Sequence, residues 1–504
     1  MSRIDHNQPF VTEYMSRIDR DRLLSLPKPR FTGTRFFRRY YRLFLTILLV
    51  ITDVVSNLVA PIVCYLTWNA IKGDMDAAIY TRLLPLILFF PLAYVLTGLY
   101  PAIGMSPVDE FRRLTISTIM VYMIIVSLSF FFRNAEQYSR VTFLLSLLGT
   151  ILMLPVGRSI LRAVLVKNGI FGEPVAIIGS GEHAQKIHDY FLIKPELGFH
   201  PVIMLDGSDS NLPPSQDQHV ANLATVFRKG LPEQAAGVQT AFLVPEEISP
   251  ELLKHLFEVN KSIFHKLILT PNDWIWGTIA ITPLDVEGIL CLSVQHNLYN
   301  RVYKVLKTII DLSLIVLSSP IWLSILGISA ILIKLDTHGS VLYSQVRLGR
   351  AGKKIRIWKL RTMIQDAELQ LREYLEKNPE YSKDWETNYK ILNDQRVTRV
   401  GKILRRFSLD EIPQFWNVIK GEMSLVGPRP IVDAERVRFG SRLETILKVK
   451  PGISGYWQIS GRNDILYNER VLMDEYYVKN CSLWFDIYII FKTIIAMIGG
   501  RGAY

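Results

Sequence analysis

Two adjacent acidic residues, Asp410 and Glu411, lie in the block Ser408-Leu-Asp-Glu-Ile-Pro413 of the last third of the chain. One interpretation is structural, because Ser408 and Glu411 have the spacing of a helix capping box and acids in a first turn suit the helix dipole. The other is chemical. Phosphoryl transfer needs at least one carboxylate that reacts and a second carboxylate beside it that holds Mg²⁺.

Basic residues set among glycines and prolines favour the chemical interpretation. They lie in the blocks Trp358-Lys-Leu-Arg-Thr-Met363, Ser424-Leu-Val-Gly-Pro-Arg-Pro430 and Lys450-Pro-Gly-Ile-Ser-Gly-Tyr-Trp-Gln458, the last followed by Gly461-Arg462-Asn463. The candidates are Lys359, Arg361, Arg429 and Arg462. Guanidinium groups in such turns are suited to bind phosphates. A fifth block, Asp474-Glu-Tyr-Tyr-Val478, adds another acid.

The composition agrees with an anionic ligand and with a membrane. The 58 lysines and arginines exceed the 46 acids, and the net charge of +12 fits nucleic acid, anionic lipid or phosphorylated substrates. Hydrophobic residues make up 49% of the chain, which is unusual for a purely soluble protein. The three cysteines are far apart in the sequence, which argues against a disulfide framework and against a zinc site.

The elements that must position these groups begin with a polar leader, residues 1–34, and a membrane part, residues 35–170. Four apolar stretches, 43–71, 83–100, 114–132 and 141–157, are each long enough for, or close to, a spanning helix of ~17–25 residues. Flanking cations, including Arg158 after the fourth stretch, place the N-terminus in the cytoplasm by the positive-inside rule. Asp53 is the only charge within them. It is either a functional carboxylate or hydrogen-bonded to a neighbour such as Asn57.

Residues 171–300 have the pattern of a Rossmann-like α/β domain. An apolar strand at 175–178 leads into Gly179-Ser-Gly181-Glu-His-Ala184, a helical pattern follows, and a second strand at 202–205 ends in Asp206. This is the arrangement of a dinucleotide-binding βαβ unit. Either Gly179, Gly181 and Asp206 form a nucleotide site at the helix N-terminus, or the domain keeps the tight turn without a cofactor.

The third part, residues 301–504, opens with a fifth apolar stretch at 308–335. Its centre is Ser318-Ser319-Pro320, and proline bends a helix. Many lysines and arginines follow closely, which favours the cytoplasmic side. We therefore predict a re-entrant helix broken at Ser319 and Pro320, the alternative being a kinked span. The apolar tail at 483–498 carries Asp486 and Lys492, which predicts a helix lying in the membrane interface.

Taken in order, the blocks resemble the bacterial sugar transferase family, the monotopic polyprenyl-phosphate phosphoglycosyl transferases. The family pattern is Lys-x-Arg-Thr-Met, Ser-Leu-Asp-Glu-x-Pro-Gln, Met-Ser-Leu-Val-Gly-Pro-Arg-Pro, Lys-Pro-Gly-x-x-Gly-x-Trp-Gln and Gly-Arg-Asn. At three x positions the chain differs from the usual residue, with Leu360 for phenylalanine, Ser454 for threonine and Tyr456 for leucine, and none of these changes removes a reactive group. The four spans and the Rossmann-like middle look like those of the large members, especially those that act on galactose.

This resemblance implies a mostly α-helical catalytic domain with a re-entrant membrane helix, behind a four-helix membrane bundle and the Rossmann-like domain. It implies transfer of a hexose-1-phosphate from a UDP-hexose to undecaprenyl phosphate with release of UMP, at the start of O-antigen, capsule or exopolysaccharide synthesis. Galactose is favoured over glucose. The implied location is the bacterial inner membrane, with the catalytic domain on the cytoplasmic face, contact with membrane lipid, a homodimer and no nucleic acid partner.

Residue by residue, the resemblance makes Asp410 the nucleophile that forms a covalent aspartyl-phosphosugar. Glu411, together with Asp410, would bind Mg²⁺. Basic residues at the phosphates of the substrate are matched by Lys359, Arg361, Arg429 and Arg462, and Asp474 matches a third acid. Ser319 and Pro320 match the break of the re-entrant helix.

A rival interpretation is a membrane-bound, NAD-dependent nucleotide-sugar dehydratase or epimerase. Tyr303-x-x-x-Lys307 has the spacing of the Tyr–Lys pair used in that chemistry. This interpretation leaves the five C-terminal blocks unexplained, and so does a non-enzymatic scaffold for polysaccharide assembly.

Overall fold

The computed structural model of the protein describes most of the chain beyond the predicted leader. The described residues are 35–73, 81–131, 138–179, 181–206, 220–223, 238–248, 266–270, 281–286, 289–294, 300–365, 396–460 and 467–499, with isolated residues at 226, 231–232, 235, 264, 298, 367, 371 and 376. They form two compact units, one ending at residue 270 and the other beginning at residue 281. The predicted Rossmann-like domain extends to 300, so the hairpin of β6 (Ile281–Val286) and β7 (Ile289–Val294) falls on the other side of this boundary.

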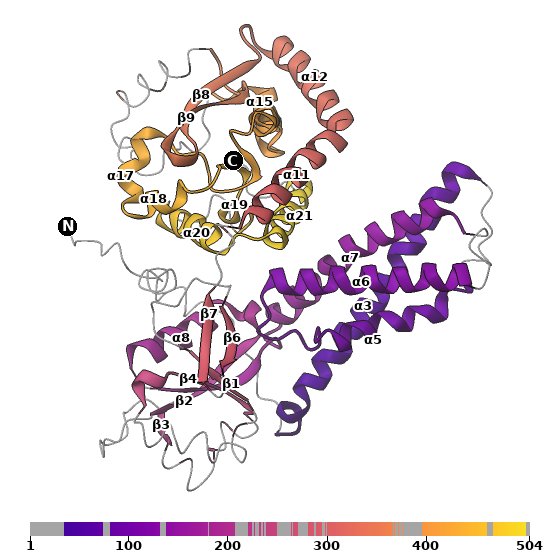
Figure 1. Ribbon diagram of the computed structural model, residues 1–504, viewed down its shortest axis with the longest axis vertical. Coiled ribbons are helices and arrows are strands. Elements are labelled where there is room, and N and C mark those ends of the chain that lie inside the picture. Colours follow the sequence, from indigo (N-terminus) through magenta and orange to yellow (C-terminus); the bar gives the residue numbers. More distant parts are fainter. Residues whose placement is uncertain are drawn as a thin grey trace. The chain divides into compact units, whose positions relative to one another are not determined.

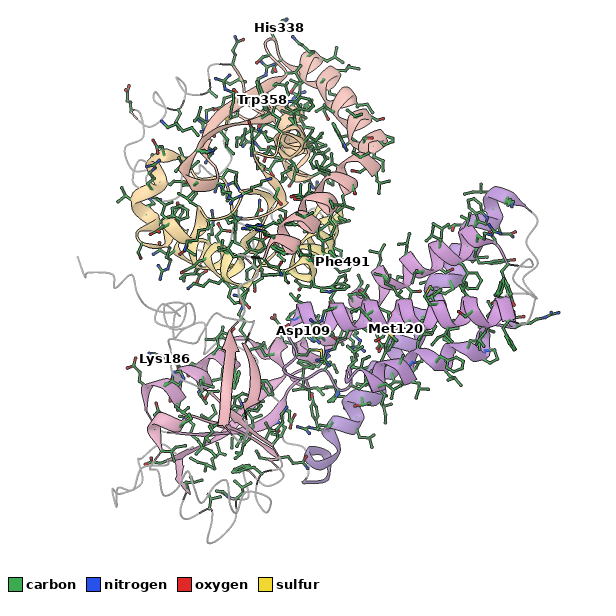
Figure 2. All side chains as sticks on the ribbon, in the orientation of Figure 1. Asp109, Met120, Lys186, His338, Trp358 and Phe491 are labelled. Carbon is green, nitrogen blue, oxygen red and sulfur yellow. The ribbon has the colours of Figure 1, made fainter. Side chains whose placement is uncertain are left out.

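The first unit contains three helices that are long and apolar enough to cross a membrane: α3 (Arg35–Lys72), α6 (Pro107–Phe131) and α7 (Arg140–Lys167). They lie side by side in Figure 1, and α3 packs along α7. Their outward surfaces are apolar, and Met120, labelled on α6 in Figure 2, is 57% exposed. Apolar side chains exposed along whole helices fit a lipid environment better than water.

The second predicted span is shorter than the sequence analysis expects. It consists of a 3₁₀ turn, η1 (Leu84–Leu88, five residues), followed by helix α5 (Phe89–Leu96, eight residues). A straight span needs ~20 residues. Pro85 and Pro91 have a fixed φ and no N–H donor, which explains why the regular helix begins only at Phe89.

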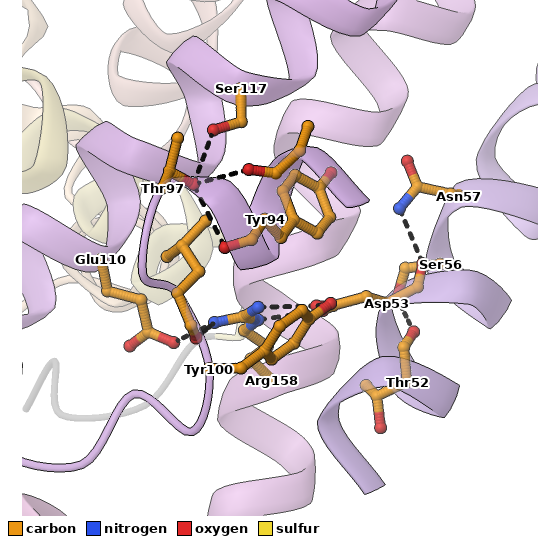
Figure 3. Close-up of polar contacts among 12 residues, drawn as sticks. Thr52, Asp53, Ser56, Asn57, Tyr94, Thr97, Tyr100, Glu110, Ser117 and Arg158 are labelled. Carbon is orange, nitrogen blue, oxygen red and sulfur yellow. Dashed lines mark hydrogen bonds and ion pairs between the residues drawn. The ribbon is translucent and has the colours of Figure 1, made fainter. Parts of the chain in front are cut away.

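Asp53 is buried inside the helix bundle and pairs with Arg158 (Figure 3). Arg158 Nε lies 2.9 Å from Asp53 Oδ1, and Nη2 lies 2.6 Å from Oδ2. The Tyr100 hydroxyl donates a further hydrogen bond of 2.6 Å to Oδ2. Asn57 does bond to Asp53, but to its backbone carbonyl oxygen. The partner of the carboxylate is therefore an arginine that lies 105 residues further along the chain.

Arg158 also reaches helix α6. Its Nη1 lies 2.9 Å from Glu110 Oε1, and Glu110 Oε2 lies 2.9 Å from Arg162. Two carboxylates and two guanidinium groups thus balance in charge and link α3, α6 and α7. The prediction that Arg158 flanks the fourth span is wrong, because α7 continues to Lys167 and Arg158 is buried. A buried arginine is tolerated here because each of its three nitrogens donates to an acceptor.

The Rossmann-like part of the first unit is a parallel five-stranded sheet. Its strands are β1 (Glu173–Ile178), β2 (Phe199–Asp206), β3 (Val220–Asn222), β4 (Thr240–Leu243) and β5 (Lys266–Leu269), in the order β3-β2-β1-β4-β5. The predicted βαβ unit is confirmed, since helix α8 (Glu182–Ile193) connects β1 to β2. The strand order reverses between β1 and β4, which is where open α/β sheets bind ligands.

The first membrane helix is fastened to this sheet. Arg42 on α3 lies 2.6 Å from Glu173 on β1 and donates to Thr240 on β4 at 3.1 Å. The backbone N–H of Gly172 donates to the Tyr41 hydroxyl at 2.8 Å. These contacts make the membrane helices and the sheet parts of one unit.

The second unit is mostly helical around small two-stranded sheets. Its helices and turns are α11 (Arg301–Leu317), α12 (Ser319–Asp336), α15 (Arg399–Arg406), η10 (Leu409–Gln414), α16 (Phe415–Ile419), η11 (Asp433–Glu435), α17 (Arg436–Phe439), α18 (Arg442–Ile446), α19 (Tyr456–Ser460), α20 (Tyr467–Asn480) and α21 (Leu483–Gly499). The antiparallel pair β8 (Leu342–Leu348) and β9 (Lys354–Leu360) and the parallel pair β10 (Ser424–Val426) and β11 (Gly452–Ser454) complete it.

The fifth apolar stretch is two helices that meet at Ser318. Figure 1 shows that the direction of the chain changes between α11 and α12. Pro320 lies in the first turn of α12, where its missing N–H is tolerated. Two carbonyls in the last turn of α11 accept side-chain donors: the Ser318 hydroxyl donates to Leu314 at 2.6 Å, and the Trp322 indole donates to Ile315 at 3.0 Å. A break of this kind satisfies its own polar groups, as lipid requires.

We expect Arg158→Met to destabilise the first unit strongly. The change leaves the carboxylate of Asp53 buried without a cation, which costs about 3–5 kcal/mol when one partner of a buried pair is removed. Thermal unfolding of the full-length protein in detergent measures the effect. Asp109→Asn is the matched control, because Asp109 pairs with Arg112 at the surface of α6, where an ion pair contributes about 0–1 kcal/mol. Equal unfolding midpoints for the two variants would contradict the structural role of Arg158.

Candidate functional site

Strand β9 and the turn η10 bring Lys359 to the acidic pair. Lys359 Nζ lies 2.7 Å from Glu411 Oε1 and 3.9 Å from Asp410 Oδ2. The predicted capping box is not formed, because Ser408 makes no side-chain cap and the Glu411 carboxylate turns to Lys359. Ser408 instead adopts a left-handed φ of 54° between α15 and η10. A serine in this conformation is strained, and such strain is commonly found at functional sites.

Asp410 is the less solvated of the two acids. Burial, and next the neighbouring Glu411 carboxylate, raise the pKa of Asp410 to about 6, while Lys359 and Arg405 act in the opposite direction. Above pH 6 the side chain is therefore ionised, and it is a stronger base than an ordinary aspartate. A carboxylate of this kind suits nucleophilic attack at neutral pH.

Arg405 is a site residue that the sequence analysis missed. It lies in the last turn of α15 and is held by a hydrogen bond of 2.9 Å from its Nε to Thr362. Its charge stabilises ionised Asp410. The only signal in the sequence is an arginine five residues before the acid, and basic residues also end helices for structural reasons.

Gly427 and Gly452 allow the blocks 424–430 and 450–458 to pair in one small sheet. Strands β10 and β11 pair in parallel, and the pairing continues when Gly427 N donates to Ser454 at 2.9 Å and Gly452 N donates to Pro428 at 2.8 Å. A Cβ atom at Gly427 would lie 2.6 Å from the carbonyl oxygen of Lys450. Only glycine permits this approach, which fixes the course of the chain from Gly427 to Arg429.

Arg429, which follows Gly427 in the chain, contacts Asp474, the third predicted acid. The backbone N–H of Arg429 lies 3.4 Å from Asp474 Oδ2 on α20. Burial raises the pKa of Asp474 to about 8, although the N–H and the charge of Arg429 oppose the shift. Within the described part of the chain, Asp474 Oδ1 has no hydrogen-bond partner. Asp474 is thus a protonated acid at neutral pH, and its buried Oδ1 can still take part in a hydrogen bond.

A cavity of about 20 Å³ opens beside Asp474, large enough for about one water molecule. Arg429, Arg470 and Trp457 are among the residues that line it. Arginines crowd this region: burial and the charge of Arg429 lower the pKa of Arg347 to about 10 and also lower that of Arg470. Crowded cations attract an anion. Neither Arg347 nor Arg470 is among the predicted site residues.

Arg361 is placed differently from the prediction. Its Nη1 donates to the carbonyl of His338 at 2.6 Å, and its Nη2 donates to the carbonyl and the hydroxyl of Thr337, both at 2.9 Å. Arg361 therefore caps the C-terminal end of α12 near His338, which is labelled in Figure 2. A role at a phosphate stays a prediction for it, and Arg462 lies outside the described residues.

The described residues contain no group of three or more histidine, cysteine, aspartate or glutamate side chains that could hold a metal ion. The pair Asp410 and Glu411 still suits Mg²⁺, which binds through one or two carboxylates together with phosphates of the substrate. The expected magnesium therefore fits a site that is completed by the substrate.

Tyr303 and Lys307, the pair of the rival interpretation, are part of a buried hydrogen-bond network. Asp486 on α21 accepts from Tyr303 at 2.9 Å and from Tyr477 at 2.6 Å, and it lies 2.9 Å from Lys307 Nζ. These contacts join α11, α20 and α21. They also show that Asp486 is buried within the second unit and is not a charge that marks a membrane interface.

Gly179 and Gly181 lie between β1 and α8, and Asp206 ends β2, as a dinucleotide motif requires. Apart from Arg361 at the end of α12 and from Ser319 and Pro320 at the helix break, the structure groups the predicted residues that it describes into three places. Lys359 lies with Asp410 and Glu411, Arg429 lies with Asp474, and the two glycines lie in the Rossmann-like part of the other unit.

Comparison with known proteins gives matches over both units. A family model described as bacterial sugar transferase matches residues 302–500, and one described as CoA-binding domain matches residues 96–228. The chain is 33% identical to the UDP-galactose-lipid carrier transferase of Erwinia amylovora over 77% of this chain and 81% of the relative. It is 30% identical to the undecaprenyl-phosphate galactose phosphotransferase of Salmonella typhimurium, over 73% and 77%. The exopolysaccharide production protein ExoY of Sinorhizobium fredii is 45% identical, over 38% of this chain and 83% of the relative.

We expect Asp474→Asn to remove a pH dependence of stability. The folded chain holds a proton on Asp474 up to about pH 8, whereas an unfolded aspartate releases it near pH 4, so wild-type stability falls as pH rises between these values. As pH rises, the free energy of unfolding of the wild type should fall by about 1.4 kcal/mol per pH unit relative to that of Asp474→Asn. Unfolding midpoints of the full-length protein from pH 6 to pH 8 measure this. Exposed Asp433, changed to asparagine, is the control, and parallel curves for wild type and Asp474→Asn would contradict the assignment.

Proposed function

Because the chain belongs to the bacterial sugar transferase family, we propose that it transfers a hexose-1-phosphate from a UDP-hexose to undecaprenyl phosphate and releases UMP. The observation that carries this proposal is the acidic pair beside Lys359, in which burial keeps the pKa of Asp410 near 6. A dehydratase is not supported, because Tyr303 and Lys307 are held by Asp486 in a buried network.

Asp410 would act as the nucleophile in two displacements. Its carboxylate oxygen attacks the phosphorus that bears the sugar, the bond from that phosphorus to the oxygen of UMP breaks, and UMP leaves. A phosphate oxygen of undecaprenyl phosphate then attacks the same phosphorus and releases Asp410 as a carboxylate. Such a covalent intermediate divides one difficult transfer into two easier ones. The ionised state of Asp410 above pH 6 supports the first step.

The cations near these acids would bind the diphosphate. Lys359 lies within hydrogen-bond distance of Glu411, and Arg429 lies with Asp474. Arg405 keeps Asp410 ionised. Mg²⁺ held by Asp410 and Glu411 would neutralise charge on the diphosphate. Asp474, protonated at neutral pH, can donate a hydrogen bond to a substrate oxygen.

The reaction would take place at the cytoplasmic surface of the inner membrane. The two helices that meet at Ser318 expose large apolar side chains, including Leu317 and Ile321 on either side of the break. A re-entrant arrangement leaves both ends of this segment, and the basic residues that follow it, on the cytoplasmic side. The lipid substrate then needs to expose only its phosphate.

Galactose is the sugar that we propose, on the basis of the named relatives that match most of this chain. The product would start the synthesis of an O-antigen, a capsule or an exopolysaccharide. The predicted homodimer stays a prediction.

We expect Asp410→Asn to abolish the release of UMP from UDP-galactose in the presence of Mg²⁺ and undecaprenyl phosphate. Asparagine has nearly the same volume but cannot form the acyl phosphate, so the loss should reach the detection limit while the unfolding midpoint is unchanged or higher. It is not expected to fall, because burial disfavours the charge of Asp410. The control variant is again Asp433→Asn, which should keep full activity. An active Asp410→Asn enzyme would exclude the proposed nucleophile.

The proposed sugar is tested by a panel of UDP-sugars with the wild-type enzyme. We expect kcat/KM for UDP-galactose to exceed that for UDP-glucose, UDP-N-acetylgalactosamine and UDP-N-acetylglucosamine. Lipid-linked product, measured by mass spectrometry, distinguishes transfer from hydrolysis. A preference for UDP-glucose would keep the proposed reaction and replace its sugar.

Re-entry is tested with Arg301→Cys and Lys353→Cys, each in a background without the native cysteines. Both positions are exposed and lie on opposite sides of the break at Ser318. A membrane-impermeant maleimide should label both in inside-out vesicles and neither in right-side-out vesicles. Opposite labelling of the two cysteines would show that the segment crosses the membrane.

A further inference from the structure

We propose that the side chain of Glu247 fills the phosphate position of the Rossmann-like domain, so that this position binds no nucleotide cofactor. The inference goes beyond the sugar transfer and concerns the other unit of the chain. It decides between the two interpretations that the glycine motif leaves open.

The carboxylate of Glu247 lies at the N-terminal end of helix α8. The backbone N–H of Gly181 donates to Glu247 Oε2 at 2.8 Å, and the N–H groups of His183 and Ala184 donate to Oε1 at 3.0 Å and 3.4 Å. In a dinucleotide site, the N–H groups of the first helical turn and the positive end of the helix dipole bind the pyrophosphate. A negative group of the chain itself already uses them.

The glycines of the motif make room for this side chain. A Cβ atom at Gly179 would lie 2.6 Å from Glu247 Oε2, and a Cβ atom at Gly181 would overlap the same carboxylate. In a cofactor site these glycines would allow the pyrophosphate to approach the backbone. Here they allow the approach of a carboxylate, so the glycines alone do not indicate a cofactor.

The position of Glu247 in the sheet blocks the route of a cofactor as well. Glu247 ends the short turn η5 (Pro245–Glu247), which follows β4, and β4 is the neighbour of β1 where the strand order reverses. Cofactors of open α/β sheets lie in the crevice at this reversal. The turn that enters the crevice carries the acid that caps α8.

The charge of Glu247 opposes an incoming nucleotide. Hydrogen bonds from N–H groups to a carboxylate are stronger than those to a neutral oxygen. A pyrophosphate would have to displace this internal ligand and approach its negative charge. The residues therefore do not fit coenzyme A or a dinucleotide bound through its phosphates at this turn, and the contact serves to fasten η5 to the turn between β1 and α8.

The test compares Glu247→Ala with Glu182→Ala in the full-length protein. Glu182 is an exposed glutamate in the first turn of the same helix, where it pairs with Lys186. We expect wild type to show no saturable binding of coenzyme A or NAD⁺ by calorimetry. Glu247→Ala should lower the unfolding midpoint, and inorganic phosphate should restore it saturably, because the vacated N–H groups accept another anion. Wild type and Glu182→Ala should show neither effect.

Saturable binding of coenzyme A or NAD⁺ to the wild-type protein would overturn the proposal. A Glu247→Ala variant as stable as Glu182→Ala would overturn it too, and so would a destabilised variant that phosphate does not restore. If Glu247→Ala does not fold, Glu247→Gln takes its place. That variant keeps the shape and one acceptor oxygen but loses the charge, so it should lower the unfolding midpoint less, and phosphate should restore the midpoint only in part because the side chain still covers the N–H groups. An unfolding midpoint equal to that of Glu182→Ala would overturn the proposal.

Discussion

A carboxylate that leaves water must find cations or hydrogen-bond donors, and this requirement shapes both units of the protein. In the helix bundle, Asp53 is surrounded by Arg158 and Tyr100. In the second unit, Asp486 is surrounded by Lys307 and by two tyrosine hydroxyls. Because each acid and its donors come from distant segments, every such contact holds several helices together. The free energy cost of burying one charge therefore determines the arrangement of segments that are far apart in the sequence.

Two acids of the candidate site meet this requirement only in part. Asp410 has its charge compensated only in part, and Asp474 is so poorly compensated that it keeps its proton at neutral pH. Incomplete compensation is costly for stability, and a fold retains it where the group is needed for chemistry. In this respect Asp53 and Asp486, which are paired with cations and hydroxyl donors, differ from the two acids of the candidate site.

The sequence predicts residue types and local motifs well and predicts partners poorly. The acidic pair, the basic blocks, the first βαβ unit and most of the apolar helices follow from patterns within a few residues. The sequence predicts Arg158 at a membrane boundary because it follows an apolar stretch, and Asp486 at the membrane interface because it is a charge within a short apolar run. Arg158 contacts a partner 105 residues away, and Asp486 contacts one 183 residues away. No local sequence pattern predicts these two contacts. Arg405 is close to Asp410 in the sequence, but basic residues also end helices for structural reasons, so its position alone does not identify it as a site residue. Arg361 caps the end of α12, a contact that the sequence does not predict.

Glycine motifs show most clearly why local patterns leave function open. Gly427 is required because the backbone of another strand passes within reach of a Cβ, and this packing sets Arg429 beside Asp474. Gly179 and Gly181 are required because the side chain of Glu247 occupies the space above them. A cofactor would impose the same requirement. In each case the glycine indicates only that another group packs closely against the backbone. That group belongs to a segment outside the motif. A glycine-rich turn becomes evidence for a ligand only when the rest of the fold leaves its N–H groups free.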